Sequence, residues 1–360
     1  MKQGYVIGIH RPFNMPLKSL VWVCRFSKDY IEKKDHDFYL DFFLWMLEAI
    51  DKHEESFDEH NAIGIPRPKN VQCVLNMFAN CPYDDIKNKV RLTLTERITD
   101  EEKIIYSSYK NTSYYITLAK KINLIDGRCY LKPLGEELAN LRDYNFFNLT
   151  DKHRLIIFRA LCRDFFENMI IITQSQRLIK GDRALEDSFF RAYLKRYKSE
   201  GVIKYITSFD KNYLEVLRHW VFTLKLCIKT GIIRKVYLTE IDDLGLTTQF
   251  KTIVHNAELF FSDEFKNKIK QEQQFDKIRE AYEKLQNSGQ AEFGFVNLYD
   301  IKKNFRLSYE SFNKLLNLYY SEYRHSEIIL FSNTVSSIDM RRRFFVAGNA
   351  VLKIRIIKKS

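Results

Sequence analysis

The sequence predicts a mainly α-helical protein with small β-hairpins, an α+β fold made of tandem winged helix-turn-helix domains. Two stretches, 113–131 and 217–238, share one plan: an amphipathic helix, a tight break and a short hairpin whose second strand carries Tyr-Leu. A third stretch, 298–356, begins with helical spacing of apolar residues and changes to the two-residue period of strands. Because the helix before such a wing commonly enters a DNA groove, this plan indicates a nucleic-acid ligand.

The first copy has one apolar helical face followed by two conformational signals. The face is formed by residues at helical spacing, Tyr115, Leu118, Ala119 and Ile122. Asn123 is expected to take the left-handed conformation that ends a helix, and Asp126-Gly127 is typical of a two-residue hairpin turn. Pro133 then begins a short helix, as proline does in a first helical turn.

The second copy repeats this pattern with different residues. Its apolar face is formed by Trp220, Val221, Leu224 and Ile228. Gly231 is expected to stop the helix, since glycine adopts positive φ without strain. Before this copy, the stretch 148–151 is expected to cap a long helix that runs through Phe166.

The third stretch combines a capped helix with strands. Its apolar helical positions are Leu298, Ile301, Phe305, Phe312, Leu315, Leu316 and Tyr319. Ser308 is the expected N-cap. Residues 327–331, 342–346 and 351–356 have strand patterns, and Gly348-Asn349 is the expected hairpin turn between the last two. Since both of these strands carry basic residues, we expect one long basic wing.

The chain is basic, with 58 Lys and Arg residues against 46 Asp and Glu, a formal charge of +12 and a pI near 9.2. The excess is uneven, since residues 171–235 hold fourteen basic and six acidic side chains, and residues 341–359 hold seven basic and no acidic ones. A local basic excess attracts nucleic-acid phosphates without regard to base sequence. These two regions are therefore the expected electrostatic contacts, with double-stranded DNA as the expected partner.

Three groups of residues are the candidate DNA contacts. In the first copy, polar side chains suited to base edges stand among lysines suited to phosphate: Lys110, Asn111, Thr112, Ser113, Lys120 and Lys121. Around the second copy the candidates are Arg191, Lys195, Arg196, Lys225, Arg234 and Lys235. In the carboxyl-terminal wing they are Arg341, Arg342, Arg343, Lys353 and Arg355. The alternative is a solvated charged surface, and no metal or cofactor is expected.

Breaks in composition divide the chain into expected parts. They are an amino-terminal segment (1–62), winged-helix domain 1 (63–146), winged-helix domain 2 (147–262), a polar helical spacer (263–290) and a carboxyl-terminal winged-helix domain with the basic wing (291–360). The strongest linker signal is the Gly- and Pro-containing stretch 61–68. A length of 360 residues suits about two to four modules.

Cysteine usage and hydropathy give expectations about the compartment. The six cysteines form no CxxC pair and mostly occupy apolar positions, so reduced structural thiols are expected. No signal peptide opens the sequence, and its longest apolar runs are too short to span a bilayer. The expectation is therefore a cytoplasmic protein without a membrane partner.

Catalytic motifs are weak in this sequence. A metal-dependent nuclease needs an Asp and a nearby Glu-x-Lys on adjoining strands, because carboxylates hold the cation and lysine stabilises the leaving charge. Residues 100–103 have the letters Asp-Glu-Glu-Lys in a polar context, and Glu240 with Asp242 and Asp243 has no suitably placed lysine. The sequence holds no phosphate loop of the GxxxxGKS or GxxxxGKT type. We therefore expect no catalytic residues in this chain.

Two segments carry a family resemblance: residues 4–20 with the apolar stretch after them, and the first helix and hairpin, which end in the Tyr-Leu-Lys-Pro-Leu-Gly run from Tyr130 to Gly135. Together they resemble the DNA-recognition region of type IIS restriction endonucleases of the FokI kind. The similarity covers residues 4–240 in the order of elements, and Lys132 stands where threonine is usual. It implies winged-helix subdomains stacked in tandem to read an asymmetric DNA site. Those enzymes also carry a separate nuclease domain, for which we expect no room here.

Three functions remain open at this stage. The first is a non-catalytic protein that binds double-stranded DNA as the recognition subunit of a restriction, antiviral defence or other DNA-processing complex, whose partner proteins carry the enzymatic activity. The second is a restriction-type nuclease with a divergent metal site. The third is a winged-helix scaffold that binds protein partners. Metal-dependent cleavage would single out the nuclease, and a lack of DNA affinity at moderate salt would single out the scaffold.

Overall fold

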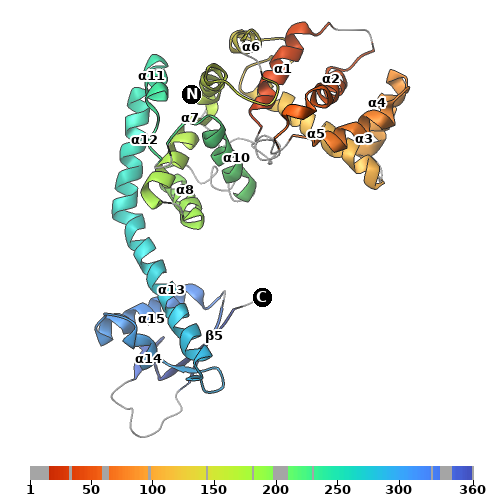
Figure 1. Cartoon of the computed structure of the whole chain (residues 1–360). Helices are drawn as coiled ribbons and strands as arrows, with labels where there is room; N and C mark the ends of the chain where they lie inside the picture. Colours follow the sequence, from red (N-terminus) through yellow and green to blue (C-terminus); the bar gives the residue numbers. More distant parts are fainter. Residues whose placement is uncertain are drawn as a thin grey trace. The chain divides into compact units, whose positions relative to one another are not determined.

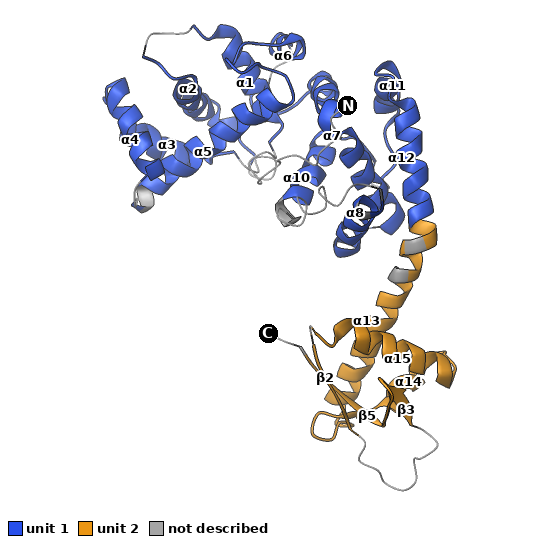
Figure 2. Ribbon diagram, turned by 180° about the vertical axis from the view of Figure 1, so that it is seen from behind, with its two compact units in different colours: residues 1–260 blue, residues 261–360 orange. Residues whose placement is uncertain are grey.

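The computed structural model describes residues 16–31, 35–58, 65–95, 99–142, 145–180, 182–197, 210–228, 231–325, 327–332 and 343–358. In these residues the protein is mainly helical with a few short antiparallel strands, which confirms the α+β class. The chain forms two compact units, Met1–Phe260 and Phe261–Ser360 (Figure 2). Each unit buries apolar side chains of its own.

The described part of the first unit is mostly helical (Figure 1). In chain order they are α1 (Lys18–Asp29), α2 (Phe38–Lys52), η2 (Glu54–Ser56), α3 (Pro68–Phe78), α4 (Tyr83–Thr95), α5 (Asp100–Lys121), α6 (Pro133–Ala139), α7 (Asp151–Ile179), α8 (Arg183–Tyr197), α10 (Asp210–Thr223), α11 (Lys235–Asp243) and α12 (Thr247–Phe260). Thr150 is the N-cap of α7, and its hydroxyl accepts a hydrogen bond from the backbone N–H of His153 at 3.4 Å. The expected cap in 148–151 is therefore confirmed.

Two helices organise the packing of this unit. α1 packs against α2, α5 and α6, and α7 packs against α8, α10, α11 and α12. The indole N–H of Trp22 in α1 donates to the carbonyl of Phe146 at 2.8 Å, and the two rings stack with centroids 4.6 Å apart. In the second half, Trp220 meets Phe165 of α7 edge-on at 5.2 Å. Both tryptophans are fully buried, so each anchors one half of the core.

The two hairpins expected from the sequence have the same backbone geometry, 102 residues apart. An isolated antiparallel bridge joins Ile125 to Leu131 in the first, and the equivalent bridge joins Cys227 to Ile233 in the second. The helix-to-hairpin hydrogen bonds also match, from Leu124 N to Ala119 O (2.9 Å) and from Leu226 N to Val221 O (3.0 Å). After each hairpin the chain enters a short helix, α6 or α11. The structure therefore contains an internal helix-hairpin-helix repeat.

The turn of the first hairpin differs from the expected one. Asn123 has φ 61°, as predicted for the residue that ends α5. However, the left-handed residue of the hairpin is Cys129 (φ 70°) and not Gly127. The carboxylate of Asp126 accepts hydrogen bonds from the backbone N–H groups of Arg128 (2.8 Å) and Tyr130 (2.9 Å). This side-chain capping stabilises a turn longer than two residues, which is why the two-residue prediction was wrong.

In the second copy Gly231 does not end the helix. α10 ends at Thr223, and Lys225 takes the left-handed conformation with φ 52°. Gly231 (φ 75°) lies instead in the hairpin, against α7. A Cβ at this position would lie 2.8 Å from Thr173 O and 2.7 Å from Arg177 N. The prediction was wrong because this glycine serves the close approach of two backbones rather than a helix end.

The second unit combines helices with two small sheets. Its elements are η3 (Phe261–Phe265), α13 (Lys266–Asn287), β1 (Val296–Asn297), α14 (Leu298–Lys303), α15 (Tyr309–Tyr323), β2 (Glu327–Ser332), β3 (Phe344–Val346), β4 (Asn349–Val351) and β5 (Lys353–Lys358). One antiparallel sheet has the order β1-β5-β2, and β3 pairs with β4. The expected cap of α15 is confirmed, since Ser308 Oγ accepts from Ser311 N at 3.1 Å.

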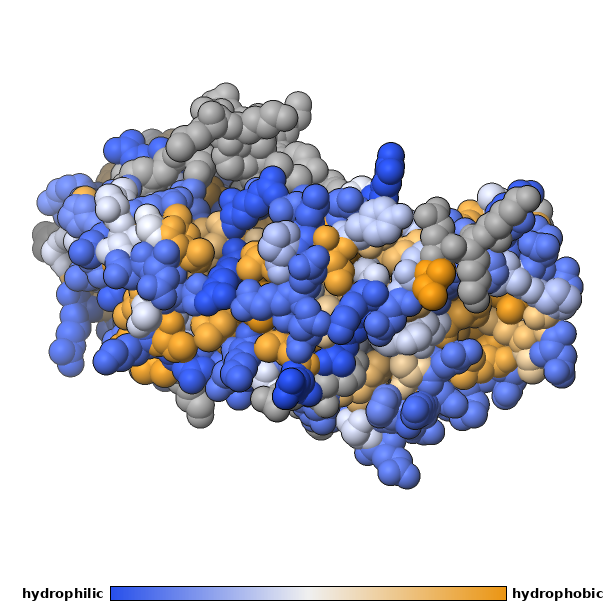
Figure 3. Space-filling model, turned by 90° about the horizontal axis from the view of Figure 1, so that it is seen from above, coloured by the Kyte–Doolittle hydropathy of each residue, from blue (hydrophilic) through white to orange (hydrophobic). Residues whose placement is uncertain are grey.

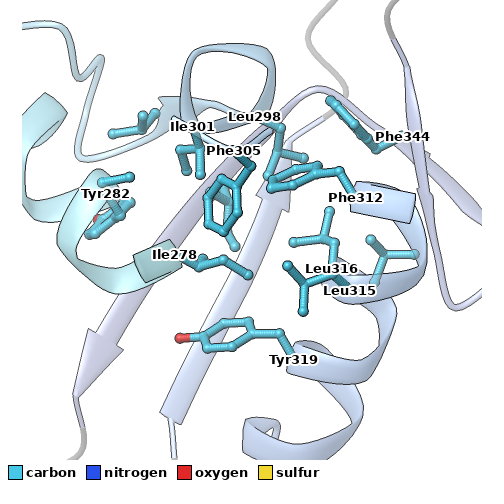
Figure 4. Packing of buried hydrophobic residues seen from close by; sticks show 14 of the residues in the cluster. Ile278, Tyr282, Leu298, Ile301, Phe305, Phe312, Leu315, Leu316, Tyr319 and Phe344 are labelled. Carbon is cyan, nitrogen blue, oxygen red and sulfur yellow. The ribbon is translucent and has the colours of Figure 1, made fainter. Parts of the chain in front are cut away.

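The core of this unit lies between the helices and the sheets (Figure 4). All the apolar helical positions expected for the third stretch are buried in it. Phe275, Ile278 and Tyr282 of α13 join them, so the polar stretch expected as a spacer contributes one face to this core. A buried network connects α13 to α15 and β2. In it, Glu327 accepts hydrogen bonds from Arg279 Nε (3.0 Å) and from the Tyr319 hydroxyl (2.6 Å).

The carboxyl-terminal wing is not the single ribbon expected. Its turn consists of Ala347 (φ 48°) and Gly348 (φ 82°), one residue earlier than predicted. The returning strand breaks at Leu352, which is buried and whose backbone binds Ser332 O and Leu298 N. As a result β4 pairs with β3, whereas β5 pairs with β1 and β2. The alternating pattern of 351–356 suggested one strand because the apolar residues on both sides of the break face the same core.

Candidate nucleic-acid interface

The second hairpin carries a basic surface at its base. Lys225 and Lys235 are exposed. Arg234, which directly precedes Lys235 and is the N-cap of α11, is half-buried. Arg234 Nη1 donates to the carbonyl of Lys225 at 3.5 Å, so the ends of the hairpin hold these cations close together. We call Lys225, Arg234 and Lys235 the hairpin patch. It unites three residues predicted from the sequence as DNA contacts.

A cavity of about 360 Å³ adjoins this patch where the two halves of the first unit meet. Lys225 belongs to its lining together with Lys18, Arg154 and His219. These side chains come from α1, α7 and α10, and from the stretch that follows α10. Among the described residues that line the cavity, none carries a carboxylate. We call it the cationic cavity, because its charge favours an anion.

Lys18 is the most unusual member of the cationic cavity. Its side chain is buried, and its ammonium group donates to the carbonyls of Asn145 and Asn148, the latter at 2.6 Å. Burial, reinforced by the charges of Arg25 and Arg154, lowers the pKa of Lys18 to about 7. An anion bound nearby would favour the charged lysine and raise this pKa again. Anion binding in the cavity would therefore be coupled to protonation of Lys18.

Arg154 and His219 are held in place at the end of α10. Arg154 Nε donates to the carbonyl of Thr223, the last residue of α10, at 3.0 Å. The same guanidinium reaches Asp151 through Nη1 at 2.7 Å. His219 Nδ1 lies 3.0 Å from the hydroxyl of Thr223. These contacts fix the helix end from which Lys225 projects.

Lys18, Arg154 and His219 were not predicted from the sequence. Their separation along the chain gives no motif, because the cavity forms only when α1, α7 and α10 pack together. The one sequence signal for Lys18 is its place just before the apolar run 20–24, because a lysine that is buried beside such a run needs partners.

In the first copy, the residues expected to read bases are engaged within the fold. Thr112 is fully buried, and its hydroxyl donates to Ser108 O at 2.8 Å, so the prediction that it reaches DNA was wrong. Ser113 donates to Lys110 O at 2.7 Å, and the ammonium of Lys110 lies over the ring of Tyr106 at 4.7 Å. The reason is that α5 packs against α1, α2, α3 and α4, which cover more than one of its faces.

The other candidates of this copy are partly occupied too. Lys120 Nζ donates to the Tyr39 hydroxyl at 3.2 Å and to Gly127 O at 3.1 Å, which ties the hairpin to α2. Lys121 is half-buried, and burial lowers its pKa. Asn111 Oδ1 is buried and has no hydrogen-bond partner among the described residues. This copy therefore offers fewer accessible cations than its sequence suggested.

The candidates on α8 are less informative. Arg191 is half-buried and Arg196 is exposed. For Lys195, the structure describes the helical backbone alone.

The carboxyl-terminal candidates do not form one clamp. Arg341 and Arg342 lie outside the described residues. Arg343 precedes β3, whereas the ammonium of Lys353, on β5, pairs with the carboxylate of Glu292. The Arg355 side chain packs beside Gly294. The expectation that both strands of one ribbon present cations was wrong, because Lys353 and Arg355 lie on β5, whereas β3, the strand that follows Arg343, belongs to the other sheet.

The hairpin of β3 and β4 covers part of α15. Asn313 Oδ1 accepts from Phe345 N at 2.7 Å, Asn317 Nδ2 donates to Phe345 O at 2.5 Å, and Asn317 Oδ1 accepts from Ala347 N at 3.0 Å. Tyr309 of the same helix stacks on Phe344 at 4.4 Å. The two asparagines thus bind the open backbone edge of β3 as a neighbouring strand would. They are not accessible for base recognition in this arrangement.

In each of the two acidic motifs considered for catalysis, one glutamate has a structural role. The Glu102 carboxylate accepts from Thr99 N at 2.9 Å and completes the capping box of α5. Glu240 forms a two-point ion pair with Arg159, at 2.6 and 3.1 Å. Within the described ranges, no group of three or more His, Cys, Asp or Glu side chains is arranged to hold a metal ion.

Comparison of this chain with protein-family models, with curated proteins and with solved structures finds no match. In the part of the chain that is described, no helix combines the length and the apolar character needed to cross a bilayer.

Proposed function

We propose that this protein binds double-stranded DNA without catalysing a reaction on it. The observation that supports this most is the repeated helix and hairpin, whose second copy places the hairpin patch beside the cationic cavity. Phosphate contacts of this kind provide affinity and position the protein on the duplex. The cationic cavity receives one backbone phosphate, and the patch contacts its neighbours along the strand.

The second unit supports the winged-helix interpretation of the chain. Its order of α13, β1, α14, α15, β2, a hairpin and β5, with the sheet order β1-β5-β2, is compatible with that of a winged helix. The face of α15 that carries Asn313 and Asn317 is covered, so this unit contributes less to base recognition than the first. A tandem arrangement of winged-helix subdomains is also what the resemblance to type IIS restriction endonucleases implies.

In this proposal the protein is the recognition subunit of a cytoplasmic restriction, defence or other DNA-processing complex. Partner proteins supply the enzymatic activity. The free thiols of the six cysteines agree with a reducing compartment.

A scaffold function is the second candidate, and one observation favours it. Phe222, Ile228, Ile232 and Val236, around the second hairpin, are exposed by 74%, 51%, 54% and 42%. Hydrophobic residues also interrupt the hydrophilic surface on the face drawn in Figure 3. Apolar side chains next to cations suit a protein partner as well as a DNA groove, where such residues act as wedges between bases.

A charge-matched comparison tests the proposal. Affinity for a short labelled duplex is measured by fluorescence anisotropy over a series of salt concentrations. The test variant replaces the hairpin patch, Lys225→Ala, Arg234→Ala and Lys235→Ala. The control variant removes the same charge from exposed positions on α3, α4 and α12, Lys69→Ala, Arg91→Ala and Lys251→Ala.

The test variant should bind more weakly, and its plot of log affinity against log salt should be shallower by about 0.9 for each phosphate that the protein no longer neutralises. The control should keep a slope close to that of the wild type. Equal reductions in affinity in both variants would refute a specific role for the patch. Wild-type protein that does not bind the duplex at moderate salt would favour the scaffold, and cleavage of the duplex on addition of Mg²⁺ would favour the nuclease.

A further inference from the structure

A second and larger cavity, of about 620 Å³, lies in the first unit. Its walls come from the end of α1, from α2, from Tyr30, Ile31 and His36 between these helices, and from the first residue of α4. Four aromatic side chains line it: Phe26, Tyr30, Trp45 and Tyr83. This volume falls in the range of cavities that hold small organic ligands. We call it the aromatic cavity.

The charge of the aromatic cavity is opposite to that of the chain as a whole. Three carboxylates line it, from Asp29, Asp41 and Glu48, in a protein with a formal charge of +12. Among the described lining residues, the one guanidinium is that of Arg25, and its Nη2 donates to the backbone carbonyl of Leu141. Three carboxylates against one guanidinium leave an excess of negative charge beside the aromatic rings.

Hydrogen bonds and ring contacts hold this lining in place. Asp41 accepts from the Tyr30 hydroxyl at 3.1 Å and lies 3.1 Å from His36 Nδ1. The His36 ring stacks on Tyr83 with centroids 4.0 Å apart, and the Tyr83 hydroxyl accepts from Asp37 N at 3.0 Å. Because these residues are already fixed by one another, little ordering remains to be done when a ligand enters.

The aromatic residues of α1 and α2 form a connected wall. The ring of Phe26 lies 5.6 Å from Trp45 and 5.2 Å from Tyr30 between centroids. Trp45 is half-buried. Burial raises the pKa of Tyr83 to about 12, so this ring stays neutral at physiological pH; the hydrogen bond from Asp37 N opposes this shift, and Asp41 adds to it. The wall is therefore apolar and electron-rich.

We propose that the aromatic cavity binds a weakly hydrated organic cation, such as a methylated ammonium or a guanidinium group. Aromatic faces attract cations through the ring quadrupole, and nearby carboxylates add a Coulomb attraction. A small inorganic cation is disfavoured, because rings cannot replace its hydration shell. The cation comes either from a free small molecule or from a side chain of a protein partner, and both present the same chemistry.

Choline and its neutral isostere 3,3-dimethylbutan-1-ol test the requirement for charge. Binding to the full chain is followed by isothermal titration calorimetry and by tryptophan fluorescence, in which Trp45 is the responsive residue because Trp22 and Trp220 are fully buried. We expect choline to bind at least about tenfold more tightly than the alcohol. Equal binding of the two, or no saturable binding of choline, would overturn the proposal.

Two variants locate the site. Trp45→Leu should abolish the fluorescence response and weaken binding in calorimetry. The double variant Asp29→Asn with Glu48→Gln changes two exposed carboxylates and should leave folding intact while it weakens choline binding about three- to tenfold. Unchanged affinity in both variants would place the choline elsewhere and refute the assignment.

Peptides distinguish the two sources of the cation. A short peptide with one trimethyllysine and the same peptide with unmodified lysine are titrated beside choline. Tighter binding of the trimethylated peptide than of choline identifies a protein side chain as the natural ligand, and the reverse order identifies a free small molecule. If neither choline nor the trimethylated peptide binds more tightly than the unmodified peptide, the aromatic rings do not contribute and the proposal fails.

Discussion

Gly231 offers a sharp test of how the second hairpin is held on α7. In Gly231→Ala the new Cβ would lie 2.7 Å from Arg177 N and 2.8 Å from Thr173 O, both of them backbone atoms. Its φ of +75° would also force alanine into the left-handed region, at a cost of about 1–2 kcal/mol. Overpacking adds about 1–3 kcal/mol. The unfolding free energy of the first unit should therefore fall by about 2–5 kcal/mol.

Gly245→Ala is the matched control. Gly245 has a similar φ of +69°, but no atom lies within 4 Å of the position that a Cβ would take. Gly245→Ala should lower the unfolding free energy by about 1 kcal/mol, from backbone strain alone. Urea unfolding followed by tryptophan fluorescence reports on the first unit, because the three tryptophans lie at positions 22, 45 and 220. Equal destabilisation of the two variants would show that the hairpin is not pressed against α7.

Three further changes test other contacts. Gly135→Ala would place a Cβ 2.0 Å from Leu124 O, so it should detach α6 from the first hairpin and lower the unfolding free energy of this unit by several kcal/mol, seen in the same urea assay. The pKa of Lys18 is lower in the folded state than in the unfolded state, so the unfolded state keeps this proton up to a higher pH. The unfolding free energy of the wild type, relative to that of Lys18→Met, should therefore rise by up to about 1.4 kcal/mol per pH unit above pH 7. A difference between the two proteins that does not change with pH would show that Lys18 titrates normally. Glu327→Gln should lower the melting temperature of the second unit, at a cost of about 2 kcal/mol, because the half-buried Arg279 loses the charge of its buried partner Glu327; an unchanged melting temperature in circular dichroism would contradict this.

Local signals in the sequence were sufficient where one residue decides a conformation. Asn123 and Ser308 end and begin helices as expected, since left-handed and capping preferences act within a few residues. The apolar period of the third stretch likewise identified its core. Such features depend little on the rest of the fold.

Features that depend on tertiary packing could not be predicted in this way. Lys225 and Gly231 are both compatible with a left-handed helix end, and the contact of the hairpin with α7 decides between them. Thr112 has a polar side chain of a type that can contact base edges, but it lies where α5 is covered by other helices. The cationic cavity joins residues from helices that are far apart in the sequence, α1, α7 and α10, and no spacing along the chain predicts it.

The salt dependence of DNA binding by the wild-type chain tests the central claim most directly. Affinity for a short duplex is measured from low to physiological salt. If the hairpin patch, the cationic cavity and neighbouring cations neutralise about six phosphates, affinity should fall by roughly a thousandfold between about 50 and 200 mM salt. An affinity that is nearly independent of salt would contradict the claim that this protein binds DNA through its phosphates.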